Sequence, residues 1–167
     1  MKIPLLPITL ITLFGLFGCN KHTDNPEVDK YIDDLISGTY ESYDLPDFST
    51  ADISALLEYR NETTTVTNYP HNPISSFWQP ECKLGILVLW TVESIRAVEN
   101  KSEYITGRFP SQNPALALRD APELQMVFDD QSLKVAARAY YDWWNSFHPI
   151  KEKLKADPLV NTDYRWH

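Results

Sequence analysis

Two cysteines, four histidines and two Asp-Asp pairs are the first candidates for chemistry in this 167-residue sequence. Cys82 could act as a nucleophile if His71 or His148 accepted its thiol proton. A lone cysteine beside an apolar run is more commonly a small buried side chain, and we favour that interpretation. A hydrolase that uses Cys82 is therefore an alternative and not the main expectation.

The acid pairs are Asp33–Asp34 and Asp129–Asp130. A glycoside hydrolase needs two carboxyl groups that converge across a cleft, which adjacent positions do not establish. We expect a solvated helix face for the first pair and a helix-entry turn for the second. The hydrolase alternative therefore has two versions, one that uses Cys82 and one that uses a carboxylate pair.

The histidines do not lie at ligand spacing from one another or from a cysteine, and neither H-E-x-x-H nor C-x-x-C occurs. There is no G-x-S-x-G, and five glycines could hardly build a phosphate-binding loop. The sequence therefore predicts no catalytic residues, no metal site and no cofactor.

Glu93 and Arg96 are charged residues inside the most apolar segment after the N-terminus, Glu81 to Glu99. Its apolar residues recur at helical spacing and continue around the opposite side: Leu84, Leu87, Val88, Thr91, Ile95 and Val98, then Ile86, Leu89, Trp90 and Val92. A helix that is apolar nearly all round is a central, buried one. Because an unpaired buried charge is costly, we predict a structural ion pair between Glu93 and Arg96.

Tyr141 and Trp143 are the candidate binding residues. They fall on a second predicted helix, from Ser132 to about Phe147, whose buried stripe is Leu133, Ala136, Ala137, Tyr140, Trp144 and Phe147. Tyr141 lies on the polar side and Trp143 at the edge of the stripe. Aromatic rings at such positions can bind a sugar or a protein partner. The alternative is that the C-terminal tail folds back over both, with Trp166 packing beside them.

The remaining elements are predicted to be short helices. They cover Glu27 to Ile36, Ser49 to Asn61, Pro122 to Phe128 and Ile150 to Ala156, with proline-rich loops between them. The β-branched run from Thr63 to Thr67 could form a strand but has no convincing partner. The sequence therefore predicts an all-α fold, a small irregular bundle of about five helices in one domain, residues 27–167.

An internal similarity raises the alternative of degenerate HEAT-like α-α repeats. Tyr69 to Pro73 and Phe109 to Pro114 both read aromatic-Pro, one or two residues, then Asn-Pro, and each precedes a major predicted helix. They begin about 40 residues apart, which lies at the lower end of the HEAT repeat period.

The N-terminus is predicted to be a targeting signal. Lys2 and the apolar run from Ile3 to Phe17 form a signal peptide, residues 1–18, that is too short to span a membrane. The sequence Leu16-Phe17-Gly18-Cys19 matches a lipobox, so Cys19 would be lipidated and residues 19–26 would form a tether. An ordinary cleaved signal peptide is the alternative. Asn20, where aspartate would favour retention, indicates the outer membrane.

The formal net charge of −8 argues against binding to nucleic acid or to an anionic membrane surface, since both need clusters of Lys and Arg. Removal of the signal peptide, whose only charged residue is Lys2, would make the chain one unit more negative.

The chain resembles small uncharacterised lipoproteins of the Bacteroidetes that carry a domain of unknown function. Besides the lipobox, the resemblance rests on the stretches DISALLEYRNETT, NPISS, LGILVLWTVESIRAV, RFPSQNPALALRD and AYYDWW. It implies a location and a compact helical domain but no substrate.

The expected function is that of a lipid-anchored cell-envelope protein with a non-catalytic binding or assembly role, in contact with the membrane through its anchor. The partner would be another envelope protein or a glycan. A glycan-binding accessory lipoprotein and a hydrolase are the two alternatives.

We predict that Cys19→Ala abolishes lipidation and leaves the precursor unprocessed, because the thiol that would carry the lipid is removed. Metabolic labelling with an alkyne fatty acid and gel mobility measure both effects, and Cys82→Ala serves as the control that should mature normally. Normal processing of the Cys19 variant, with continued partition into membranes, would show that the lipoprotein interpretation is wrong.

Overall fold

The computed structural model describes residues 24–121 and 124–167. The predicted signal peptide, Cys19 and most of the predicted tether therefore lie outside the described residues. Within the described ranges, every helix is too short or too polar to cross a membrane.

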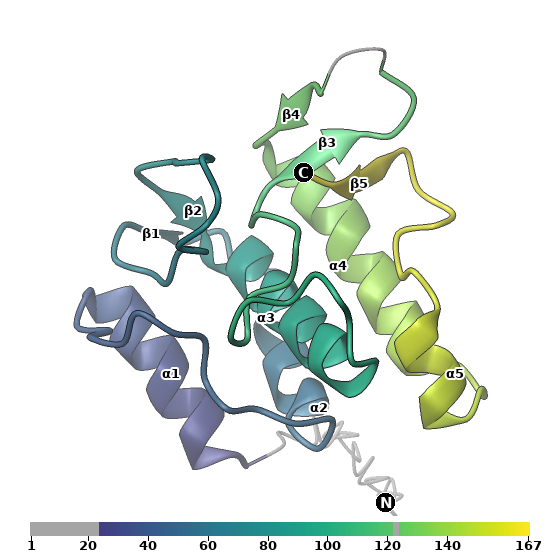
Figure 1. The fold of residues 1–167 in the computed structure, drawn as a ribbon, viewed down its shortest axis with the longest axis horizontal. Coiled ribbons are helices and arrows are strands. Elements are labelled where there is room, and N and C mark those ends of the chain that lie inside the picture. Colours follow the sequence, from purple (N-terminus) through teal and green to yellow (C-terminus); the bar gives the residue numbers. More distant parts are fainter. Residues whose placement is uncertain (1–23, 122–123) are drawn as a thin grey trace, which may run out of the picture.

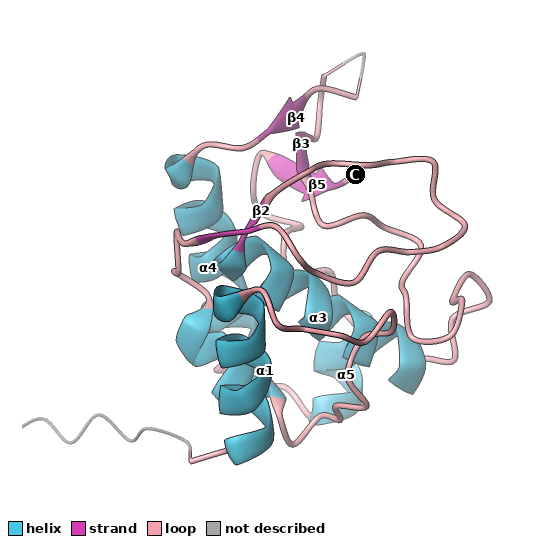
Figure 2. Ribbon diagram, turned by 90° about the vertical axis from the view of Figure 1, so that its left-hand side faces the viewer, coloured by secondary structure: helices cyan, strands magenta, loops and turns pink. Residues whose placement is uncertain are grey.

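One central helix organises the domain. The helices are α1 (Pro26–Ser37), α2 (Ile53–Leu56), a 3-10 helix η1 (Leu57–Tyr59), α3 (Leu84–Glu99), α4 (Asp130–Trp144) and α5 (Ile150–Lys155). Figure 1 shows α3 between α1 on one side and α4 on the other. Figure 2 shows the helices gathered together, with the strands above them. Burial of α3 follows from its sequence, since residues from Leu84 to Ile95 are all buried.

Two small antiparallel sheets accompany the helices. In the first, β1 (Thr65–Val66) pairs with β2 (Cys82–Lys83), and Val66 lies opposite Cys82. In the second, the strand order is β4 (Met126–Val127), β3 (Leu116–Leu118) and β5 (Tyr164–Trp166). Leu116 lies opposite Val127 on one side and Trp166 on the other.

The prediction of an all-α fold was therefore wrong, because the domain is a mixed α/β structure. The run at Thr63 to Thr67 does contain a strand, and its partner is Cys82–Lys83, which was assigned to the start of a helix. Strand β4 lies within the predicted helix 122–128, and the C-terminal tail docks as β5. The two similar Asn-Pro loops precede β2 and β3 and not α-helix pairs, so the HEAT-like repeat is wrong as well.

The helix ends also differ from the prediction in two places. Helix α4 begins at Asp130, two residues earlier than predicted. Its N-cap is Asp129 and not Ser132, and the Asp129 carboxylate accepts a hydrogen bond from the backbone N–H of Ser132 at 2.8 Å. It ends at Trp144, so Phe147 lies outside the helix and is fully exposed, not buried.

The start of α3 packs closely against the chain before β1. The backbone N–H groups of Leu84 and Gly85 donate to the carbonyls of Thr64 and Glu62, at 2.8 and 2.9 Å, which satisfies two of the free donors at the helix start. A Cβ atom added at Gly85 would lie 2.6 Å from the Arg60 carbonyl oxygen. Only glycine allows this approach.

We predict that Gly85→Ala destabilises the protein by about 1 to 3 kcal/mol, the usual cost of overpacking. Alanine is the better helix former by about 1 kcal/mol, so any net loss must come from the close contact. Urea unfolding of the purified protein measures the effect. An unchanged or higher midpoint would contradict this account of the α3 start.

Candidate functional site

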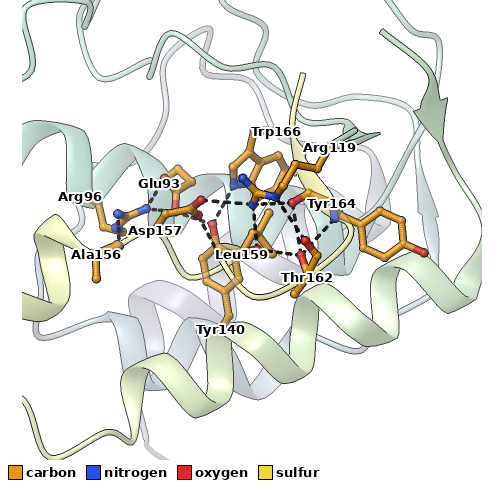
Figure 3. A network of polar contacts seen from close by, with 10 residues as sticks. All are labelled: Glu93, Arg96, Arg119, Tyr140, Ala156, Asp157, Leu159, Thr162, Tyr164 and Trp166. Atoms are coloured by element: carbon orange, nitrogen blue, oxygen red, sulfur yellow. Dashed lines mark hydrogen bonds and ion pairs between the residues drawn. The ribbon is translucent and has the colours of Figure 1, made fainter. Parts of the chain in front are cut away.

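The charged centre of the domain is the pair of Glu93 and Arg96, both nearly buried. The guanidinium of Arg96 donates to both carboxylate oxygens of Glu93 at 2.5 Å (Figure 3). Tyr140 on α4 also donates to Glu93, and the indole N–H of Trp166 on β5 donates to the Tyr140 hydroxyl at 2.8 Å. Burial, followed by the nearby Glu93 carboxylate, raises the pKa of Tyr140 well above its usual value, so this hydroxyl stays protonated and donates.

Arg96 also holds the end of α5. Its guanidinium donates to the carbonyls of Leu154 (3.2 Å) and Ala156, and the side chain of Asn100 donates to the same Leu154 carbonyl at 2.7 Å. The last carbonyls of a helix lack partners within the helix, and a cation beside them is favourable. Burial alone would lower the pKa of Arg96, but the Glu93 carboxylate outweighs it and the pKa is raised. Arg96 therefore stays charged and joins α3 to α5.

A second arginine fixes the chain that follows α5. Arg119, directly after β3, donates to the carbonyls of Leu159 and Tyr164 at 2.8 Å and of Thr162 at 3.2 Å (Figure 3). Its contact with the carboxylate of Asp157 is 3.4 Å. One side chain therefore sets the path of residues 157–164.

Trp143 is held rigidly between these elements. Its indole N–H donates to the Lys153 carbonyl at 2.7 Å, and the Arg96 guanidinium lies 5.6 Å from its ring centre. The rings of Tyr140 and Trp144 are 5.9 and 5.5 Å away. Trp143 is only 8% exposed.

Trp143 lines a hollow of about 670 Å³ between α4 and residues 156–162, which we call the α4 groove. Its apolar lining is Val135, Ala139, Trp143, Ala156, Pro158 and Val160, and its polar lining includes Gln131, Lys134, Arg138, Asp142, His148 and Asn161. The volume is in the range of ordinary ligand sites, and mixed apolar and polar lining is typical of them.

The structure separates the two predicted binding residues. Trp143 lines the α4 groove, whereas Tyr141 faces the Arg60 guanidinium, 4.6 Å from its ring centre, and Arg138 at 5.9 Å. The C-terminal chain does fold back, but Trp166 packs on Tyr140 and not beside Tyr141.

Sequence reasoning missed the other apolar residues of the groove. Val135, Ala139 and Trp143 follow one another at i, i+4 spacing, and this second row on α4 was the available signal. Pro158 and Val160 carry no such signal, because they reach the groove through the contacts of Arg119 with the loop.

Cys82 does not lie in a reactive environment. It is buried in β2, and its sulfur contacts the carbonyls of Lys83 and Pro114 at 3.5 and 3.6 Å. Burial raises the pKa of the Cys82 thiol to about 12, which disfavours the thiolate a nucleophile requires. Among the described residues, no histidine forms a hydrogen bond with it.

The acid pairs have structural contacts. Asp34 pairs with Lys30 along α1, Asp129 caps α4 and Asp130 pairs with Lys83. In the ranges that the structure describes, no group of three or more His, Cys, Asp or Glu residues is arranged to hold a metal ion.

We predict that Arg96→Ala lowers the free energy of unfolding by about 3 to 5 kcal/mol, because Glu93 would be left buried without a counter-charge. Arg138→Ala is the control: it also removes a helical arginine–carboxylate pair, with Asp142, but that pair is exposed, so the unfolding midpoint should change little. Chemical denaturation measures both. A loss below about 0.5 kcal/mol for Arg96→Ala would contradict the role given to the pair.

Comparison with known proteins identifies a family but no activity. A family model described as a domain of unknown function, DUF4943, matches residues 22–167. No curated protein and no solved structure matches the chain. The matched range covers nearly the whole chain, including α1 to β5. The chain therefore belongs to the DUF4943 family.

Proposed function

We propose that this chain is a lipid-anchored protein of the bacterial cell envelope that binds an amphipathic helix of another envelope protein in the α4 groove, without catalysis. The lipobox at Cys19 and the resemblance to Bacteroidetes lipoproteins support the anchor, and Asn20 supports the outer membrane. The groove geometry supports the binding role.

The observation that carries the proposal is the apolar row along α4. Val135, Ala139 and Trp143 line the groove at successive turns of the helix. The small Ala139 lies between the two larger side chains, which lets a partner helix approach α4 closely and pack its side chains around this point. Pro158 and Val160 extend the apolar surface across the groove.

The polar rim fits an amphipathic partner. It carries both signs of charge, with Lys134 and Arg138 on α4 and Asp142 and Asp157 among the acids. Within the described part of the chain, the side chains of Lys134 and Asn161 make no hydrogen bond or ion pair, so they remain available to a partner. Charges around an apolar centre select the register of a bound segment.

The walls are fixed before binding. Arg96 and Arg119 hold the end of α5 and residues 157–164, and Trp143 is held by four neighbours. Binding to a preformed groove loses less conformational entropy than binding that must order the loop.

The anchor limits where the partner is found. The seven residues from Asn20 to Pro26 reach roughly 25 Å when extended, at about 3.3 to 3.6 Å per residue. Helix α1 begins at Pro26, so the domain would stay close to the membrane surface. The partner is therefore a membrane protein or a neighbouring lipoprotein.

We predict that a photo-crosslinking amino acid at Asn161, introduced in living cells, gives a discrete adduct with one partner segment. A synthetic peptide of that segment should bind the purified protein and gain helical circular dichroism on binding. Val160→Glu should weaken binding of the peptide at least about tenfold, because the new carboxylate would lose hydration against the apolar surface of the groove.

Ile36→Glu on α1 is the matched control, since Ile36 is 52% exposed and Val160 is 58% exposed. It should leave the adduct and the affinity unchanged. Equal adducts with both variants would overturn the groove as the binding site, and a peptide that binds without becoming helical would overturn the helical partner.

A further inference from the structure

A second hollow lies on the other side of α3 from the α4 groove. It has a volume of about 890 Å³ and lies between residues 38–44, which follow α1, and residues 68–73, which follow β1. Figure 1 shows α1 and β1 on the side of α3 opposite α4. We call this hollow the tyrosine cleft, because Tyr40, Tyr43 and Tyr69 line it together with His71 and Phe109.

The two loops are tied to each other. The side-chain amide of Asn68 donates to the carbonyls of Gly38 and Tyr40 at 3.0 and 2.8 Å. The hydroxyl of Tyr40 donates to the Asp44 carbonyl at 2.6 Å, and that of Tyr69 donates to the Gln79 carbonyl at 2.8 Å. The backbone that carries the aromatic rings is therefore arranged without a ligand.

Aromatic surface remains available in the cleft. Tyr43 is 92% exposed, although tyrosine normally buries much of its ring area on folding. The exposed His71 ring packs against the buried ring of Tyr69, with ring centres 4.3 Å apart, and both residues line the cleft. Large rigid rings of this kind bind flat apolar surfaces with little loss of entropy.

The polar groups of the cleft include both acceptors and donors. The carboxylates of Glu41 and Asp44 form no hydrogen bond or ion pair within the described residues, and Tyr43 carries a hydroxyl. No lysine or arginine is among the residues that line the cleft. Burial lowers the pKa of His71, so the imidazole is neutral at pH 7 and gives an anion no counter-charge.

These features exclude an acidic ligand and favour a neutral one that has both apolar faces and many hydroxyl groups. A cation would contact the carboxylates but could not accept a hydrogen bond from the Tyr43 hydroxyl. We propose that the tyrosine cleft binds a neutral oligosaccharide. Tyr43 and His71 contact the faces of its sugar rings, with Tyr69 supporting the His71 ring from below, and Glu41 and Asp44 accept hydrogen bonds from its hydroxyl groups.

The experiment is titration of the mature protein, purified in detergent from its membrane, with defined probes. These are neutral trisaccharides of glucose, mannose and galactose, the acidic trimer of galacturonic acid, and spermidine as a cation. At least one neutral trisaccharide should bind, with an affinity that does not depend on salt, because no charge of the ligand is screened. The acidic trimer should not bind.

Two tyrosines test the location. Tyr43→Ala should weaken the affinity for the neutral trisaccharide about tenfold or more, as the loss of an aromatic side chain at the centre of a binding site does. Tyr104→Ala is the matched control, because Tyr104 is 73% exposed but does not line the cleft, and it should leave the affinity unchanged.

Several outcomes would overturn the proposal. Absence of binding by every neutral trisaccharide at millimolar concentration would do so, as would equal affinity in the Tyr43 and wild-type proteins. Salt-sensitive binding of spermidine in place of the sugars would show that the cleft is a cation site. None of these outcomes bears on the α4 groove, since the two sites share no lining residue.

Discussion

The burial of a guanidinium–carboxylate pair inside the most apolar helix is the constraint on which one side of the domain depends. Burying two charges costs several kcal/mol per ion unless hydrogen bonds replace the lost hydration. Here Tyr140 completes the coordination of Glu93, and the carbonyls at the end of α5 complete that of Arg96. Because each of these partners comes from a different element, the need to satisfy one ion pair brings α3, α4 and α5 together, and Trp166 adds β5 through Tyr140.

Arg96 and Arg119 perform similar tasks at two ends of one loop. Each donates to several backbone carbonyls in or beside the chain between α5 and β5, and so gives an irregular segment a defined path. An irregular segment otherwise keeps conformational freedom that a ligand would have to remove. The shape of the α4 groove therefore depends on Arg96 and Arg119, two side chains that are distant in sequence from the loop they hold.

The sequence predicted the features that a helical repeat of apolar and charged residues can indicate. Helices α1, α3 and α4 extend over several turns, and the i, i+3 spacing of Glu93 and Arg96 anticipated their contact. Strands of two or three residues are too short for alternation to reveal, which is why β4 was read as a helix. The position of Trp143 depends on a carbonyl of α5, and the tyrosine cleft depends on Asn68, so neither site could be located from local pattern. The lipid anchor remains a prediction.

The pairing of β3 with both β4 and β5 has a consequence for the order of folding. Leu116 must meet Trp166 across an intervening chain that contains all of α4 and α5, whereas the contacts within each helix are local. Local structure forms quickly, and pairings between distant segments form slowly because the loop between them must first be closed. We expect the helices to assemble around α3 before the sheet closes. An intermediate at that stage would already have much of the helix content of the native protein, yet residues 156–162, the wall of the α4 groove that Arg119 holds, would not yet be fixed.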